Sequence, residues 1–282
     1  MANQKCVSIT VRKGFSKDNG KNIWVYDKHE NREFATQVKS VGNITNFYSA
    51  DVEQYLADII EGPANTVIER IRNQEQISDS EKEILSEYMA VMFKRVPRGL
   101  ERLNEMAPSI CTDLHNKISK DLLQIAKEEP DKVHVVNNRL AEIEKILEKY
   151  AKNPPKEIWL ENIPPGRSPQ MVAALVGMKW RFLVIENSMN FLTSDNPFFH
   201  FTSIGVGNPE SEACFPISNK ILLWATWRND LPLGYITATK QGIKEMNRRA
   251  ASNATRFIFN IEFESWILPF IKKKQWKLHL FK

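Results

Sequence analysis

The sequence predicts an α+β fold in which a helical block, residues 50–152, packs with a mostly antiparallel sheet. That sheet is expected to combine an N-terminal β-hairpin with the C-terminal half of the chain. Two observations carry this prediction. Apolar residues recur at helical spacing through the middle of the chain, and apolar, aromatic runs bounded by turn residues lie on either side of it. Helices gathered in one block, instead of alternating with strands, are typical of the α+β class.

The first 48 residues predict the β-hairpin. Residues 7–11 alternate between apolar and polar, as in a half-buried strand, and residues 23–27 form a second apolar run. Asn19 and Gly20 lie between them, and both residue types tolerate a positive φ and favour a tight turn. The hairpin is therefore expected over residues 7–26.

The helical block begins near residue 51, where apolar residues recur three and four positions apart. Gly62-Pro63 interrupts this pattern, so we expect a kink or two shorter helices there. Ser80, three residues before an acidic residue, forms a capping-box pattern for the next helix, which Pro97 should end. Further helices are predicted over residues 109–128 and 132–151.

The composition changes after the helix-breaking Asn153-Pro154-Pro155. One domain is expected over residues 1–282, with sub-regions 1–48, 49–152 and 153–282. In the last sub-region, strands are predicted over residues 180–185, 189–192, 221–227 and 256–259, and helices over 171–178 and 240–254.

The composition, 42% hydrophobic and 26% charged, is typical of a soluble globular protein. No apolar run is long enough to cross a membrane, and the N-terminus lacks the apolar core of a signal peptide. Cys6, Cys111 and Cys214 are far apart and odd in number, which favours free thiols in a reducing compartment. We therefore expect a cytoplasmic protein.

The net charge of +5 is concentrated in the last eleven residues, which contain five lysines and no acidic residue. The rest of the chain is balanced between acidic and basic residues. Lys272, Lys273 and Lys274, with Trp276 close by, would suit contact with a nucleic-acid backbone. The alternative is a solvated end. The apolar segment Trp266–Ile271, just before this tail, is a candidate docking segment for a protein partner.

Familiar catalytic motifs do not occur in the sequence. It contains no Gly-rich phosphate loop, no dinucleotide-binding fingerprint and no Gly-x-Ser-x-Gly elbow. The five histidines show no zinc-ligand spacing with each other or with cysteine, which argues against zinc. Mg²⁺ held by carboxylates needs no local motif, so it stays open.

The turn Ser194-Asp195-Asn196-Pro197 is the first candidate site, because it ends an apolar run with small polar side chains held at a rigid edge. Arg95 and Asn247 are further candidates, since each shares a helical face with apolar residues and must find a polar partner. Glu61 precedes the Gly-Pro break. The alternative is that these side chains pair with one another and only fix the packing.

Several pieces of the sequence together resemble a known family over nearly the full length. They are residues 21–27, Asn46-Phe47-Tyr48, Glu61, Arg95-Val96-Pro97-Arg98, residues 191–197 and Phe215-Pro216-Ile217-Ser218. In order and spacing they are similar to the bacterial domain-of-unknown-function family 4238, and Ser-Asp-Asn-Pro followed by Phe-Pro-Ile-Ser is the most specific part. Family members typically open with His-Tyr-Val-Pro, where this chain has Lys5-Cys6-Val7-Ser8. A chemical role of that His would therefore be lost here or taken over by Lys5.

The resemblance implies a fold and a polar cluster, but no established reaction. Some relatives resemble accessory genes of mobile or defence loci, which raises a toxin or anti-phage effector. One hypothesis is hydrolysis of nucleic acid, with Glu61 and Asp195 as base or Mg²⁺ ligands and Arg95 stabilising phosphate charge. A second is a non-catalytic nucleotide- or nucleic-acid-binding module, and a third is an interaction partner in a larger complex. The residues expected to bind are Arg98, Ser194, Asn196, Asn247, Lys272, Lys273 and Lys274.

Overall fold

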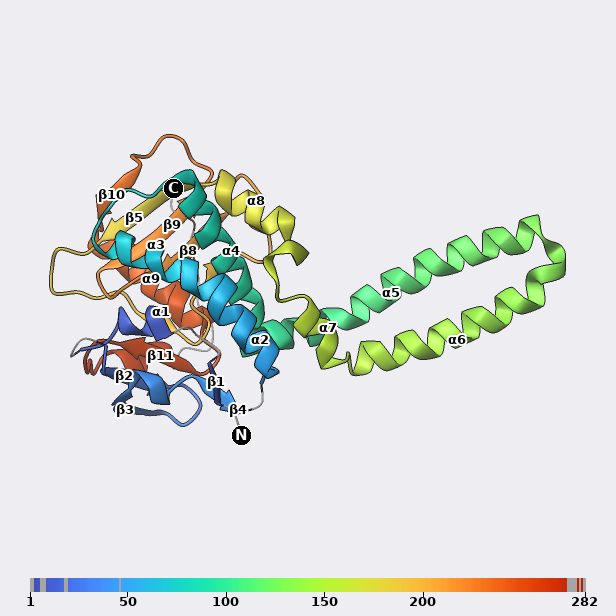
Figure 1. The fold of residues 1–282 in the computed structure, drawn as a ribbon, viewed down its shortest axis with the longest axis horizontal. Coiled ribbons are helices and arrows are strands. Elements are labelled where there is room, and N and C mark those ends of the chain that lie inside the picture. Colours follow the sequence, from blue (N-terminus) through green and yellow to red (C-terminus); the bar gives the residue numbers. More distant parts are fainter. Residues whose placement is uncertain are drawn as a thin grey trace. The chain divides into compact units, whose positions relative to one another are not determined.

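A computed structural model of the chain describes residues 3–5, 9–17, 20–45, 47–272, 278 and 280 (Figure 1). The chain divides into two compact units, the first formed by Met1–Val96 with Ile163–Lys282 and the second by Pro97–Asn162. Helices and mostly antiparallel strands are both present, so the α+β prediction is confirmed.

The first unit contains three sheets. The five-stranded sheet has the order β10 (Gly234–Thr237), β5 (Lys179–Val184), β9 (Ile221–Thr226), β8 (Glu212–Pro216) and β7 (Phe199–His200). The four-stranded sheet has the order β3 (Arg32–Gln37), β2 (Asn22–Asp27), β11 (Phe257–Asn260) and β6 (Thr193–Ser194). A small pair joins β1 (Asn3–Lys5) to β4 (Asn43–Thr45). Only the pairing of β10 with β5 is parallel among the described strands.

Helical segments surround these sheets. Before the second unit they are α1 (Ile9–Lys13), η1 (Val38–Ser40), α2 (Ala50–Tyr55), the π-helical turn η2 (Leu56–Glu61), α3 (Gly62–Arg72) and α4 (Asp79–Arg95). After it they are η4 (Pro165–Arg167), α8 (Pro169–Gly177), α9 (Lys240–Asn253) and α10 (Ile267–Ile271). The second unit consists of α5 (Pro97–Glu128), η3 (Pro130–Lys132), α6 (Val133–Lys152) and α7 (Lys156–Glu161). Within it, α5 and α6 pack side by side as a long hairpin (Figure 1).

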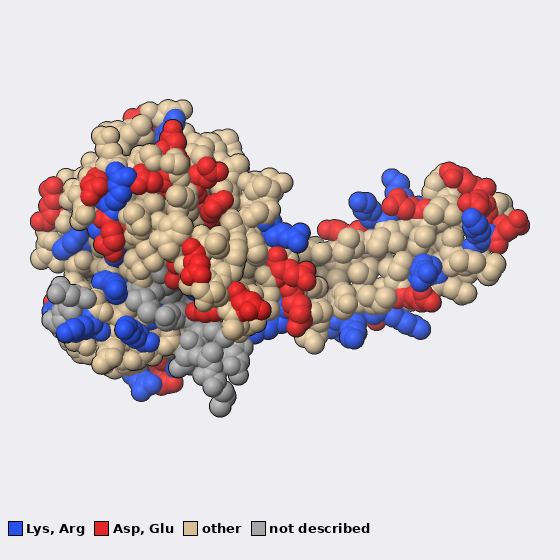
Figure 2. All heavy atoms as spheres, in the orientation of Figure 1, with Lys and Arg blue, Asp and Glu red and all other residues tan. Residues whose placement is uncertain are grey.

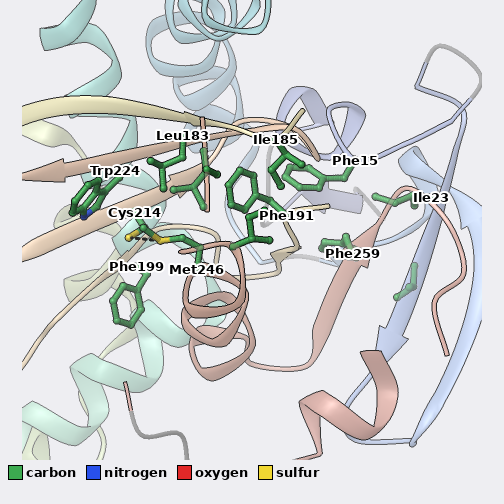
Figure 3. Packing of buried hydrophobic residues seen from close by; sticks show 14 of the residues in the cluster. Phe15, Ile23, Leu183, Ile185, Phe191, Phe199, Cys214, Trp224, Met246 and Phe259 are labelled. Carbon is green, nitrogen blue, oxygen red and sulfur yellow. Dashed lines mark hydrogen bonds between the residues drawn. The ribbon is translucent and has the colours of Figure 1, made fainter. Parts of the chain in front are cut away.

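The two large sheets share one hydrophobic core with α9 (Figure 3). Leu183 and Trp224 come from the five-stranded sheet, Ile23 and Phe259 from the four-stranded sheet, and Met246 from α9. All five are buried. Burial of this apolar surface is the main force that holds the first unit together.

Strand β8 shows how the five-stranded sheet becomes a middle layer, because successive side chains of a strand point to opposite faces. Cys214 Sγ lies 3.4 Å from Met246 Sδ of α9 on one face (Figure 3). The next residue, Phe215, meets Tyr88 of α4 edge to face on the other, with ring centroids 5.8 Å apart. The sheet therefore has α9 on one side and α4 on the other.

The N-terminal hairpin prediction is wrong in position. Residues 6–8, 18 and 19 lie outside the described residues, but Ile9–Lys13 forms the short helix α1 instead of a strand. Val11 and Phe15, four residues apart, are both fully buried, so packing of this single turn overrides the short alternation. The hairpin is formed by β2 and β3, and its turn passes through Asn31 at φ +53°.

Three smaller predictions also need correction. Residues 189–192 do not form a strand, and β6 contains only Thr193 and Ser194. The capping box of α4 uses Ser78 with Glu81, two residues before the predicted pair. Pro97 does end α4, but it also begins α5, because proline is compatible with a first helical turn. The next helix therefore starts twelve residues earlier than residue 109.

The break at Gly62-Pro63 is confirmed, and it takes the form of η2. Proline lacks an N–H and its ring disfavours the ordinary helical hydrogen bond to the preceding turn. The chain widens into a π turn over Leu56–Glu61 and then continues as α3. Such turns are common at functional positions, and this one ends at Glu61.

Candidate functional site

Glu61 and Arg95 form an ion pair between η2 and the last turn of α4. Arg95 is fully buried, and the Glu61 side chain is 18% exposed. The ring of Tyr48 lies 5.9 Å from the guanidinium carbon, and its hydroxyl donates to the Arg95 carbonyl. Burial acts to lower the pKa of Arg95, but the charge and hydrogen bond of Glu61, together with Tyr48 and Tyr88, outweigh it and the pKa is raised. The expected acidic partner of this inward arginine is thus confirmed.

Asp195 lies at the end of β6 and is only 7% exposed. Its carboxylate accepts backbone hydrogen bonds from Thr255 (2.9 Å), Arg256 (2.7 Å) and Phe257 (3.0 Å). Burial raises its pKa, although these three N–H groups favour the charged form. Asp195 therefore fastens β6 to the connection between α9 and β11.

Ser194, Asn196 and Asn247 hold the same neighbourhood together. Ser194 Oγ donates to the Asn196 carbonyl and accepts from its N–H, at 2.9 and 3.2 Å. The amides of Asn196 and Asn253 of α9 each donate to the other's backbone carbonyl, at 2.9 and 2.7 Å. Asn247 accepts from the Leu192 N–H at 2.9 Å and donates to the Asn190 carbonyl at 3.0 Å. These bonds explain why residues 189–192 are ordered without being a strand.

The predicted site residues thus fall into two groups. One is the ion pair of Glu61 and Arg95. The other, which we call the Asp195 clasp, is the Asp195 carboxylate with the three backbone N–H groups that donate to it. Arg98 belongs to the second unit, where it pairs with Glu101 at 3.1 Å and Glu105 at 2.5 Å. Of the basic tail, Lys272 is exposed, whereas Lys273 and Lys274 lie outside the described residues.

The predicted docking segment Trp266–Ile271 is partly used by the fold itself. It forms α10, and Ile267 and Ile271 are fully buried against Tyr26 and Leu192. Trp266 remains 43% exposed. The segment therefore offers a partner the ring of Trp266 but not its isoleucines.

An open cleft of about 600 Å³ lies elsewhere in the first unit, and no motif in the sequence predicts it. The ends of α1 and α3, the β8–β9 turn and the outer strand β10 surround it. Its basic lining residues are Lys13, Arg72 and Lys220, and Glu186 is its single carboxylate among the described residues. Ser218, the last residue of the Phe-Pro-Ile-Ser motif, also lines it.

Arg72 fixes the floor of this cleft. Its Nη2 donates to the Thr10 carbonyl at 2.7 Å and to the Ile217 carbonyl at 3.0 Å, and its Nη1 to Glu69 at 2.6 Å. One guanidinium thereby joins α1, α3 and the β8–β9 turn. Gly14 is required beside it, because a Cβ there would lie 2.5 Å from the Ile217 oxygen.

Lys220 and Lys13 add further positive charge to the cleft. Lys220 Nζ donates to the carbonyls of Asn187 and Met189 at 2.9 and 2.7 Å, which fixes its position without neutralising its charge. Burial lowers the pKa of Lys220, so its charge is held at some cost. Lys13 is exposed at the end of α1. The cleft is therefore positively charged and partly preorganised.

Tyr235 and Gln74 form the far side of the cleft. The Tyr235 hydroxyl donates to the Glu75 carbonyl at 2.6 Å, and burial raises its pKa to about 12. Gln74 lies two residues after the end of α3 and has φ +57°, a left-handed conformation that costs a residue other than glycine about 1 kcal/mol. Strained backbone of this kind clusters at functional sites.

No group of three or more His, Cys, Asp or Glu side chains within the described parts of the chain is arranged to hold a metal ion. The same parts contain no helix that is both long and apolar enough to cross a membrane.

Comparison with known proteins identifies a family. The family described as "Protein of unknown function (DUF4238)" matches residues 13–261. No curated protein and no solved structure matches the chain. The matched range includes the cleft residues, the Glu61–Arg95 pair and the Asp195 clasp.

Proposed function

The chain belongs to the DUF4238 family, and from the geometry of its cleft we propose that it binds a small phosphate-bearing ligand, of which a nucleotide is the class that fits best. This proposal rests on the convergence of Lys13, Arg72 and Lys220 on one open cleft, where Glu186 is the only acidic residue among the described lining residues. A volume of about 600 Å³ lies within the range of small-molecule sites.

Phosphate suits this cleft because it carries concentrated negative charge and several acceptor oxygens. An ammonium group has three N–H donors, and two of those of Lys220 are bound by backbone carbonyls. The third has no hydrogen-bond partner among the described residues, and because the side chain is already held in place, a ligand that accepts from it would add little cost in side-chain ordering. A bound anion would also offset the burial that disfavours the charged form of Lys220.

The rest of the lining suits the organic part of a nucleotide. Ile185, Ile221 and Ile236 give an apolar wall, and Thr237 and Asn219 add polar groups beside it. Such a mixture of a few polar groups with apolar side chains is typical of ligand sites. The proposal corresponds to a binding module, not to a hydrolase.

Hydrolysis of nucleic acid through Glu61, Arg95 and Asp195 is the weaker proposal. Arg95 is bound to Glu61, and Asp195 is occupied by three backbone donors, so neither group is placed to act on a substrate without leaving its partners. A toxin or anti-phage role, nucleic-acid contact by the lysine tail and a partner at Trp266 stay predictions. Growth on expression and phage challenge would test the first of these.

The binding proposal is tested by titrating ATP, GTP and inorganic phosphate into the protein by calorimetry. Removing one charge-assisted hydrogen bond costs about 1.5–3 kcal/mol, so Lys13→Ala and Lys220→Ala should each weaken binding about tenfold or more. Lys244→Ala removes an exposed lysine from α9 and serves as the matched control. Absence of binding to all three ligands, or equal binding by the intact protein and the Lys13→Ala, Lys220→Ala double variant, would refute the proposal.

A further inference from the structure

The hairpin of α5 and α6 carries most of the exposed large apolar side chains among the described residues. Fifteen large apolar side chains are exposed among the described residues, and nine of them belong to this hairpin. Uncharged surface is visible along the hairpin between its charged groups (Figure 2). Exposed apolar residues in such number mark an interaction surface.

Four of these residues share one side of the hairpin. On the other side, a groove is lined by Thr112 of α5 and Glu148 of α6. Two residues along an α-helix correspond to a rotation of about 200°, so the positions two before and two after each of these residues point away from the groove. These positions are Ile110, Leu114, Ile146 and Tyr150.

Together with Met106, one helical turn before Ile110, these residues form what we call the apolar stripe. Their side chains are exposed by 56% (Met106), 41% (Ile110), 43% (Leu114), 52% (Ile146) and 38% (Tyr150). The faces that α5 and α6 turn toward each other are separate, and they bury Ala107 and Val136. The stripe is thus a second apolar surface that the hairpin does not cover by itself.

Charged residues continue the same side toward the loop of the hairpin. Lys117 and then Asp121 follow the stripe on α5, three and seven residues after Leu114. Glu142 and then Arg139 follow it on α6, four and seven residues before Ile146. The order of charge is therefore reversed between the two helices, and the four charges sum to zero.

We propose that the apolar stripe packs on the stripe of a second copy of this chain, so that two hairpins form an antiparallel four-helix bundle. When α5 of one copy lies along α6 of the other, Lys117 faces Glu142 and Asp121 faces Arg139. The apolar stripes of the two copies then cover each other, and the opposite charges meet on the side nearer the loops of the hairpins. A two-fold dimer needs a surface of this self-complementary kind.

The present ion pair between Arg139 and Glu142 does not oppose this arrangement. Its N–O distance is 2.8 Å, and both side chains are more than half exposed. An exposed pair of this kind contributes little, so its partners can exchange for those of the second copy.

The test is the molar mass of the full chain, measured by sedimentation equilibrium over a wide range of concentration. The intact protein should be a dimer. Ile110→Lys with Ile146→Lys should raise the dimer dissociation constant about tenfold or more, since interface centres dominate affinity. Thr112→Lys with Glu148→Lys places the same residue type on the groove side and should remain dimeric.

Reversal of charge tests the pairing. Lys117→Glu should weaken the dimer, and adding Glu142→Lys should restore it.

A monomer at every concentration overturns the proposal, as does a dimer that tolerates the Ile110 and Ile146 substitutions. Circular dichroism checks that each variant is folded. If the lysine variants lose helix, Leu114→Ser with Tyr150→Ser is milder and is expected to give the same loss of dimer.

Discussion

At the scale of single residues, two arginines of similar sequence context have very different surroundings. Arg95 and Arg98 are three positions apart, but the side chain of Arg95 is 1% exposed and that of Arg98 is 36% exposed. Arg95 forms an ion pair with Glu61, whereas Arg98 forms two solvated ion pairs, with Glu101 and Glu105. Burial, not the number of ion pairs, decides which arginine the fold depends on.

Arg95→Ala is therefore expected to destabilise the protein by about 3 kcal/mol, because Glu61 is left with an uncompensated, mostly buried charge. Arg98→Ala should cost less than about 1 kcal/mol, as exposed ion pairs do. Urea unfolding of both variants measures the difference. Equal destabilisation would mean that the Glu61–Arg95 pair has no special role in the fold.

At the scale of elements, the hydrogen bonds of Arg72 join α1, α3 and the β8–β9 turn, and they depend on a close approach of the backbone at Gly14. Gly14→Ala should destabilise the first unit by about 1–3 kcal/mol, since the new methyl group must displace Arg72 or the Ile217 carbonyl. Ligand binding in the cleft should weaken as well.

Gly166→Ala is the matched control, because a Cβ at Gly166 meets nothing within 4 Å. Thermal melts of the two variants make the comparison. A melting temperature of Gly14→Ala equal to that of Gly166→Ala would contradict the claim that the Arg72 hydrogen bonds stabilise the first unit.

Lys94 links α4 to the segment around η4 and gives a second test at this scale. Its Nζ donates to the Pro164 carbonyl at 2.8 Å and to Ser168 Oγ at 3.2 Å, and burial lowers its pKa from 10.5 to about 8. The folded state therefore disfavours the charged lysine. Below pH 8 this penalty is fully present, and it is relieved as the pH rises from 8 to 10.5.

The free energy of unfolding of the intact protein, minus that of Lys94→Met, should accordingly increase between pH 8 and pH 10.5. Because both proteins contain all other titratable groups, the contributions of these groups to the pH dependence cancel in the difference. Lys244→Met, which changes an exposed lysine of α9, is the matched control. A constant or falling difference for Lys94 would show that its environment does not favour the neutral amine.

The elements that the sequence predicted well are helices with long periodic patterns and strands that form largely apolar runs. Helices α4, α6 and α9 and strands β5, β9 and β11 lie within a few residues of their predicted positions. The short segments were wrong where tertiary contacts decide: α1 is fixed by burial of Val11 and Phe15, and residues 189–192 by the side chain of Asn247. Local alternation over five residues cannot overcome such contacts.

The polar residues were predictable in part. Burial arguments required a partner for Arg95 and for Asn247, and both have one. They could not distinguish a clasp from a site, because a carboxylate held by backbone N–H groups, as in Asp195, looks the same in sequence as one that meets a ligand. The cleft was missed because Lys13, Arg72 and Lys220 are far apart in sequence and follow no motif.

At the scale of the whole molecule, the two proposals belong to different units. The cleft is formed within Met1–Val96 and Ile163–Lys282, and the apolar stripe within Pro97–Asn162. The first unit has a hydrophobic core of its own, which the two large sheets and α9 form from residues of that unit. Binding and self-association are therefore expected to be separable.

Replacing Pro97–Asn162 with a short Gly-Ser linker should leave a protein that unfolds cooperatively, because the shared core of the two large sheets and α9 is retained. Binding of nucleotide or phosphate should match that of the full chain, since every lining residue of the cleft remains. Self-association should be lost together with the apolar stripe. Calorimetry measures ligand binding and sedimentation equilibrium measures self-association, both on the same preparation.

A shortened protein that still dimerises would place the dimer contact in the first unit. One that is folded but no longer binds would mean that the hairpin contributes to the ligand site.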